Sequence, residues 1–122
     1  MKFEIALADS RKYVICTVHE PVTTDFALEF GKAASQFARQ HGLVRQLYDC
    51  RKVRNVDSVF HNYDFAYRDM VNLELEHNNR AAILVEATDR SHDFVQTVLR
   101  NAGYNVKVFV DEQQAIEWLE EP

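Results

Sequence analysis

The sequence predicts an α/β fold, with a mixed, mostly parallel five-stranded sheet and about four helices in the order ββαβαβαβα. Short apolar runs have the composition of strands, and most are separated by longer stretches with the period of an amphipathic helix. Only a short polar turn separates the first two strands, so these should pair antiparallel. The later strands are joined through helices, so we expect them to run parallel with right-handed connections.

The strands are indicated by alternation or by continuous apolar runs. Phe3, Ile5 and Leu7 alternate with less apolar residues, which is typical of a strand with one solvent-exposed face. Residues 81–85 are apolar without interruption, which predicts a central strand buried on both faces. The expected strands are residues 3–7, 13–18, 43–49, 81–85 and 105–110.

The first two helices have recognisable ends. Thr23 or Thr24 can cap the first helix, and Gly42 is placed for the left-handed residue after its last turn. A second helix is expected over residues 58–75, with Asp57 or Ser58 as its cap. Its apolar stripe is expected to point inward, with one aromatic residue facing elsewhere. The stripe holds Phe60, Tyr63, Tyr67 and Met70, and Phe65 is the residue placed off it.

The last two helices are shorter. Ser91 is the expected cap of the third, which ends at Gly103 and is expected to turn Phe94 inward. Asp111 is the expected cap of the last helix, and Gln114 follows it at the spacing of a capping box.

Length and composition restrict the class of protein. The 122 residues suit a single domain over residues 1–122, and 47% hydrophobic residues suffice for a sizeable core. The net charge of −5 argues against nucleic acid as the main partner. No stretch has the length of a transmembrane segment, and no signal peptide is evident. Two isolated cysteines suggest a reducing compartment, so we expect a cytoplasmic protein. A strand pattern directly after Met1 suggests a protein of bacterial type.

The segment 43–58 is the candidate functional region, because a strand ends in it, a basic loop follows and a helix begins. Cationic side chains and free N–H groups at a helix start favour an anion or an acidic partner surface. The competing interpretation is a solvated loop followed by an ordinary helix cap. The candidate residues are Asp49, Cys50, Arg51, Lys52, Arg54, Asn55, Asp57 and Ser58.

Catalytic and metal-binding patterns are weak. Cys50 enters a basic loop, which could lower a thiol pKa, but Val56 stands where a thiol phosphatase needs Arg. A small apolar residue at a strand end is the favoured interpretation of Cys50. His61 has acidic neighbours at helical spacing, but the set is too small for a metal site. We therefore expect no enzyme activity, no metal and no cofactor, and an enzyme using Cys50 or the aspartates is the third-ranked alternative.

The chain resembles the STAS domain family, which has the SpoIIAA-like fold of bacterial anti-sigma-factor antagonists. Two stretches carry the resemblance. The first is residues 47–49 followed by Val53 and by Asp57-Ser58, and the second is residues 106–119. The resemblance implies a SpoIIAA-like fold and a small stand-alone regulatory module. STAS domains that are phosphorylated continue with Ser or Thr and then Gly, whereas Val59 and Phe60 stand here. A phosphorylation site is therefore not carried over.

Together these observations predict a non-enzymatic regulatory or ligand-binding module that binds a protein partner or an anionic ligand at residues 51–58. The alternative is a small-molecule or lipid carrier with a cavity between the helix 58–75 and the sheet. Apolar surface beyond the needs of one core is indicated by Trp118, Phe65 and the exposed side of the aromatic helix, so a homodimer with two-fold symmetry is also expected.

Overall fold

The computed structural model describes residues 1–58, 61, 64–65, 68 and 79–122. Its five strands form one sheet in which the strand order follows the chain, β1-β2-β3-β4-β5. The β1 and β2 strands pair antiparallel, and each later neighbouring pair is parallel. This confirms the predicted mixed, mostly parallel five-stranded sheet. The strands are β1 Phe3–Leu7, β2 Val14–Val18, β3 Arg45–Asp49, β4 Arg80–Leu84 and β5 Val106–Phe109.

Three helices belong to the described residues: α1 Thr24–Gln40, α3 Asp93–Asn101 and α4 Glu112–Glu120. The prediction of about four helices is therefore not matched in the described part of the chain. The expected helix 58–75 falls largely on residues outside the described ranges, as do its stripe residues Phe60, Tyr63, Tyr67 and Met70. Among the described residues, no helix is both long enough and apolar enough to span a membrane.

Local signals placed several helix ends correctly. The Thr23 hydroxyl accepts the Phe26 N–H at 3.2 Å, and the Asp111 carboxylate accepts the Gln114 N–H at 3.0 Å. Gly42 adopts a φ of 68°, the left-handed conformation that a residue after a helix end favours. These caps form within a few residues of sequence, so the local pattern is sufficient to specify them.

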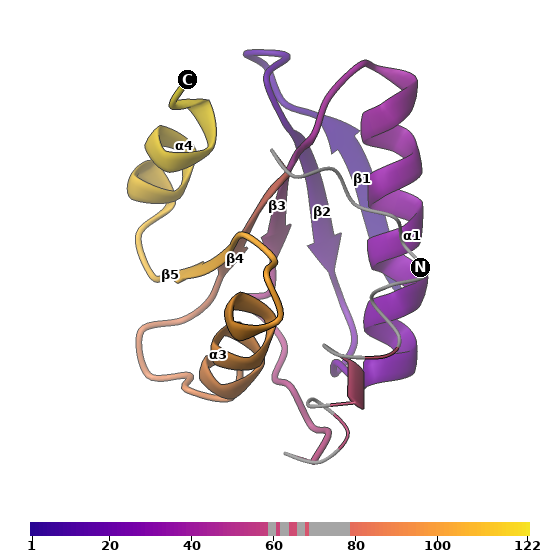
Figure 1. Cartoon of the computed structure of the whole chain (residues 1–122), viewed down its shortest axis with the longest axis vertical. Helices are drawn as coiled ribbons and strands as arrows, with labels where there is room; N and C mark the ends of the chain where they lie inside the picture. The colour runs from indigo at the N-terminus through magenta and orange to yellow at the C-terminus, as the bar shows by residue number, and fades with distance from the viewer. Residues whose placement is uncertain (59–60, 62–63, 66–67, 69–78) are drawn as a thin grey trace.

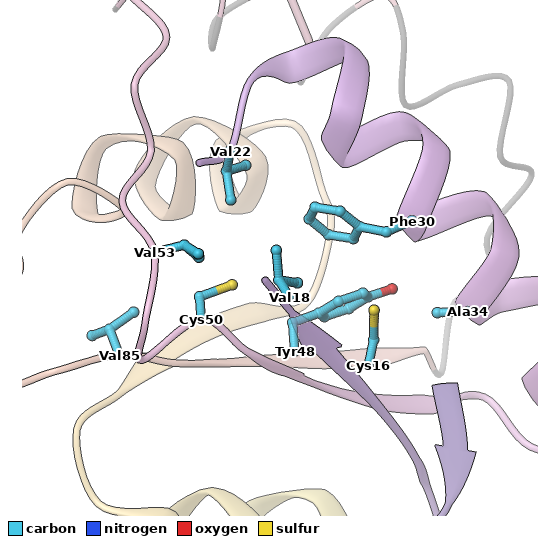
Figure 2. Packing of buried hydrophobic residues seen from close by; sticks show 9 residues of the cluster. All are labelled: Cys16, Val18, Val22, Phe30, Ala34, Tyr48, Cys50, Val53 and Val85. Carbon is cyan, nitrogen blue, oxygen red and sulfur yellow. The ribbon is translucent and has the colours of Figure 1, made fainter. Parts of the chain in front are cut away.

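The helices cover both faces of the sheet (Figure 1). On one face, α1 and α3 pack over alternate strand residues, and Figure 2 shows Phe30 and Ala34 of α1 facing Tyr48 and Cys16. The opposite face is covered by α4, whose Ala115 and Leu119 are fully buried. The β4 strand contributes to both layers, since Ala81 and Ile83 pack toward α1 and α3 while Ala82 and Leu84 pack toward α4. The predicted central strand is thus confirmed.

Two side chains were placed on the wrong face. Phe65 was expected off the inward stripe, but it is 6% exposed and packs with Val95 and Leu99 of α3. Phe94 was expected inward, but it is 37% exposed because the buried stripe of α3 begins one residue later, at Val95. Helical periodicity sets the spacing of an apolar stripe but leaves its rotation to the tertiary contacts.

Two of the residues that suggested a homodimer have contacts within the chain, while the exposed side of the aromatic helix, the third reason, lies outside the described residues. Phe65 is buried, and the Trp118 ring lies 5.5 Å from the Phe109 ring, centroid to centroid. The homodimer stays a prediction, from which the burial of Phe65 removes one supporting residue. Light scattering at tens of micromolar tests it, and a monomer mass would refute it.

Candidate functional site

The loop after β3 is attached to the segment that precedes α1. Val22 and Asn55 form a parallel bridge, with the Val22 N–H donating to Arg54 O at 2.8 Å and the Val56 N–H donating to Val22 O at 2.9 Å. Backbone pairing of this kind holds a connection in one conformation. The candidate loop is therefore held by backbone hydrogen bonds against the segment before α1.

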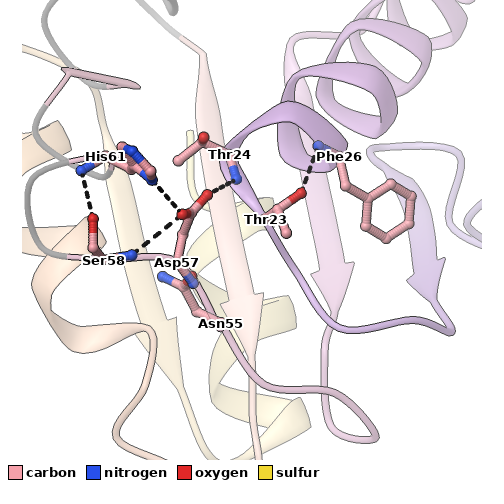
Figure 3. Close-up of polar contacts among 7 residues, drawn as sticks. All are labelled: Thr23, Thr24, Phe26, Asn55, Asp57, Ser58 and His61. Atoms are coloured by element: carbon pink, nitrogen blue, oxygen red, sulfur yellow. Dashed lines mark hydrogen bonds and ion pairs between the residues drawn. The ribbon is translucent and has the colours of Figure 1, made fainter.

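Asp57 lies at the start of α1, which it follows by 33 residues in the sequence (Figure 3). One carboxylate oxygen accepts the Thr24 N–H at 2.7 Å, and the other lies 2.6 Å from His61 Nδ1. These contacts, the Thr24 hydrogen bond first, lower the pKa of Asp57 to about 2. Asp57 in turn raises the pKa of His61. The negative charge favoured at a helix N-terminus is thus supplied to α1 by the chain itself.

Ser58 has the geometry of a helix cap. Its hydroxyl accepts the His61 N–H at 3.1 Å, three residues further along the chain. The sequence left Asp57 and Ser58 as alternative caps for the same helix. The structure separates them, because Ser58 caps the turn at His61 and Asp57 binds the start of α1.

The cations of the loop are largely engaged by carboxylates of this chain. Arg51 binds Asp49 through two side-chain hydrogen bonds of 3.0 and 2.8 Å. Burial acts to raise the pKa of Asp49, but the contacts with Arg51 outweigh it and the pKa falls. Arg54 lies 3.4 Å from the buried Asp89, and Lys52 is exposed. Most of the positive charge counted from the sequence is therefore neutralised in place.

Ser91 was expected to cap the third helix, and this is wrong. Its hydroxyl instead accepts the Asn55 N–H at 2.9 Å, and its own N–H donates to Asp89 at 2.8 Å. The residue at the cap of α3 is His92, which makes no side-chain cap hydrogen bond. Ser91 thus joins the loop after β4 to the loop after β3.

Cys50 is a buried residue at a strand end. It is 3% exposed, and burial raises the pKa of its thiol well above the ordinary value. The favoured interpretation from sequence, a small apolar residue, agrees with this burial. The basic loop does not lower the thiol pKa, because Arg51 and Arg54 pair with carboxylates.

A cavity of about 370 Å³ lies between α1, α3 and the sheet. Apolar side chains such as Phe30, Ile83 and Val95 contribute to its wall, and Phe65 closes part of it. Cys50 and Asn55 also line it, so two of the predicted site residues border the cavity. The sequence predicted a cavity between the helix 58–75 and the sheet, and of the polar lining residues only Asn55 was among its candidate site residues. The others lie on separate elements whose proximity no local pattern reports.

His92 is a cavity-lining residue that the sequence did not single out as functional. It is 3% exposed. Its Nε2 atom is buried and, within the described part of the chain, has no hydrogen-bond partner. A helix-start histidine gives no sequence signal for such a position, since its burial depends on the loops packed around it.

No group of three or more potential metal ligands occurs among the described residues. No family model, characterised protein or solved structure matches the chain.

Proposed function

We propose that this chain is a non-enzymatic binding domain that holds a small molecule in the cavity between α1, α3 and the sheet. The cavity itself carries the proposal. Its volume of about 370 Å³ lies within the range of ligand sites, and its wall combines apolar side chains with a few converging polar groups. Of the two functions expected from the sequence, a large cavity favours the carrier over the loop-based binding module.

A STAS-like regulatory role is compatible with this cavity. The element order of the described residues is compatible with the fold that the resemblance to the STAS family implies. Cys50 and Asn55 belong to both the loop and the cavity wall, so a bound molecule would contact the loop that a partner would recognise. Occupancy of the cavity could in this way alter the exposed loop.

Titration with octan-1-ol, followed by amide NMR shifts, tests the proposal. We expect the amide resonances of Ala27, Ile83 and Val95 to shift. The amide resonances of α4, on the opposite face of the sheet, should stay in place. Ala27→Leu should fill the cavity and abolish the shifts, because Ala27 lines it. Ala33→Leu is the matched control on the same helix, because Ala33 is not among the lining residues. Shifts that survive Ala27→Leu unchanged, or that centre on α4, would refute the cavity as the site.

A second candidate is docking of an acidic protein at the loop 51–58. One observation favours it: the Arg54 side chain is 66% exposed although it pairs with Asp89, and Lys52 is exposed as well. Arg51→Ala combined with Arg54→Ala should weaken binding of an acidic partner, and added salt should weaken it further. Ser58→Ala should cost about 1 kcal/mol of stability through the lost cap, and binding retained in that variant would exclude the Ser58 hydroxyl from the docking site. Retained binding in the double variant would refute this candidate.

A further inference from the structure

Gln46 is a polar residue on a buried face of the sheet. It belongs to β3, where it stands between Arg45 and Leu47, and it is 2% exposed. Arg45 donates to the end of α4, and Leu47 packs in the layer that α4 covers. Because successive side chains of a strand point to opposite faces, the Gln46 side chain points to the other face, toward α1 and α3. On that face it lines the cavity.

The side-chain amide of Gln46 opens into the cavity. Among the described residues no hydrogen bond involves this amide, whereas the Asn55 side-chain oxygen, on the same wall, accepts the Asp57 N–H at 3.1 Å. The one side-chain nitrogen or oxygen in the described ranges that is both closed off and unpaired is Nε2 of His92. The amide atoms of Gln46 are thus unpaired but not closed off. Since the residue is 2% exposed, the space that they face is the cavity that it lines.

The neighbours of Gln46 in the sheet have no partner to offer its amide. Val14 of β2 and Ala81 of β4 lie beside it in register, and both have apolar side chains. A primary amide presents an acceptor oxygen and N–H donors side by side, and leaving such a group unpaired away from water is costly. A ligand group with the complementary pair would satisfy the oxygen and an N–H together.

Building on the binding function proposed above, we infer that Gln46 holds the ligand by two parallel hydrogen bonds, to a ligand group that has a donor and an acceptor side by side. Primary carboxamides, lactams and ureas have this arrangement. The carbonyl oxygen of the ligand accepts from Nε2 of Gln46, and the ligand N–H donates to Oε1. The rest of the ligand packs against the apolar part of the wall, which includes Phe30, Ile83 and Val95.

Two uncharged probes of the same shape test this inference in a calorimetric titration. Octanamide has the donor and the acceptor, and nonan-2-one has a methyl group in place of the amide NH₂. Transfer out of water costs an amide more than a ketone, so an apolar cavity without a partner for the amide favours the ketone. Because Gln46 supplies that partner, we expect octanamide to bind at least about 10-fold more tightly than nonan-2-one.

Gln46→Met keeps the length of the side chain and removes the amide, so the ketone should then bind more tightly than octanamide. Gln114→Met is the matched control, because Gln114 is exposed on α4 and is not among the lining residues. It should retain the preference for octanamide. Without ligand, Gln46→Met should leave the urea midpoint unchanged or raise it, because it removes an unpaired buried amide. A lower midpoint would show that the amide stabilises the fold itself, and would overturn the inference.

The unaltered protein provides a test that needs no variant. The side-chain NH₂ resonances of Gln46 should shift when octanamide is added, and resonances that stay in place overturn the inference. If nonan-2-one binds as tightly as octanamide, or if octan-1-ol binds and octanamide does not, the inference is wrong and the cavity remains a binding site. If none of the three compounds binds, the proposed function is wrong as well.

Discussion

The carboxylate of Asp57 accepts the backbone N–H of Thr24 at 2.7 Å, which places a negative charge at the start of a helix that precedes it in the chain. The contact joins the loop after β3 to α1, and so holds one part of the cavity wall in place, since Thr24 lines the cavity. The same carboxylate binds His61 at 2.6 Å. The Asp57 side chain therefore links the loop after β3 to His61 and to the N-terminus of α1.

Asp57→Ala should destabilise the fold by about 1–2 kcal/mol at pH 7, since it removes a side-chain acceptor and a favourable charge from a helix start. The folded-state pKa of about 2 lies below the ordinary Asp value of about 3.9. The contribution of the Asp57 charge to the free energy of unfolding is therefore fully present above about pH 4, and it is lost as the pH falls through about 2. Urea unfolding at pH 7 and pH 2 measures it, and the difference between variant and parent should shrink at pH 2.

Asp9→Asn is the control for this prediction, because Asp9 is exposed in the turn after β1. It should leave the urea midpoint within about 0.5 kcal/mol at both pH values. A constant penalty for Asp57→Ala from pH 7 to pH 2 would show that its charge does not contribute.

Arg45 and Arg80 face each other across β3 and β4 and together bind the end of α4. Arg80 donates to Trp118 O at 2.8 Å, and Arg45 donates to Leu119 O at 2.7 Å. The last turn of α4 has no basic residue of its own, so these strand residues satisfy its carbonyl groups. Arg80→Ala should cost about 1–3 kcal/mol of unfolding free energy.

Comparing Arg80→Ala with Lys107→Ala separates two roles of Arg80, its hydrogen bonds to the end of α4 and its contact with the Trp118 ring. Arg80 also lies over the Trp118 ring at 5.7 Å, and Lys107 makes the comparable contact with Phe109 at 5.2 Å. If capping dominates, Arg80→Ala should be clearly more destabilising than Lys107→Ala in the same denaturation assay. Equal effects would assign the role of Arg80 to the aromatic contact.

Leu119→Ala should cost about 2–5 kcal/mol, because the side chain is fully buried between α4 and the sheet. Val110→Ala is the matched control at an apolar residue that is 59% exposed, and should change stability by less than about 0.5 kcal/mol. An unchanged denaturant midpoint for Leu119→Ala would contradict the packing of α4 described above.

The two thiols should be unreactive in the folded protein. Burial raises the pKa of Cys16 to about 12, and raises that of Cys50 further. Reaction with a disulfide reagent at pH 8 should therefore detect almost no thiol before urea is added and two per chain afterwards. Rapid modification of Cys50 in the native state would revive the hypothesis of a reactive thiol.

Elements whose signals are local could be predicted from the sequence. The strand runs, the Thr23 and Asp111 caps and the glycine after α1 all depend on residues within a few positions of one another. The errors lie where a side chain had a choice of distant partners. Serine is a residue type that often caps helices, yet the Ser91 hydroxyl accepts the N–H of Asn55, 36 residues away in the sequence.

The sequence by itself determined the order of the elements and the parallel character of the sheet, because hydrophobic period and connection length act along the chain. Only the tertiary structure decided that Arg51 and Arg54 are paired, that Asp57 serves α1, and that His92 is buried with an unpartnered nitrogen. The physical reason is that charge pairing, burial and cavity shape depend on which loops contact one another at the carboxyl ends of the strands. Those meetings join residues that are far apart in the sequence.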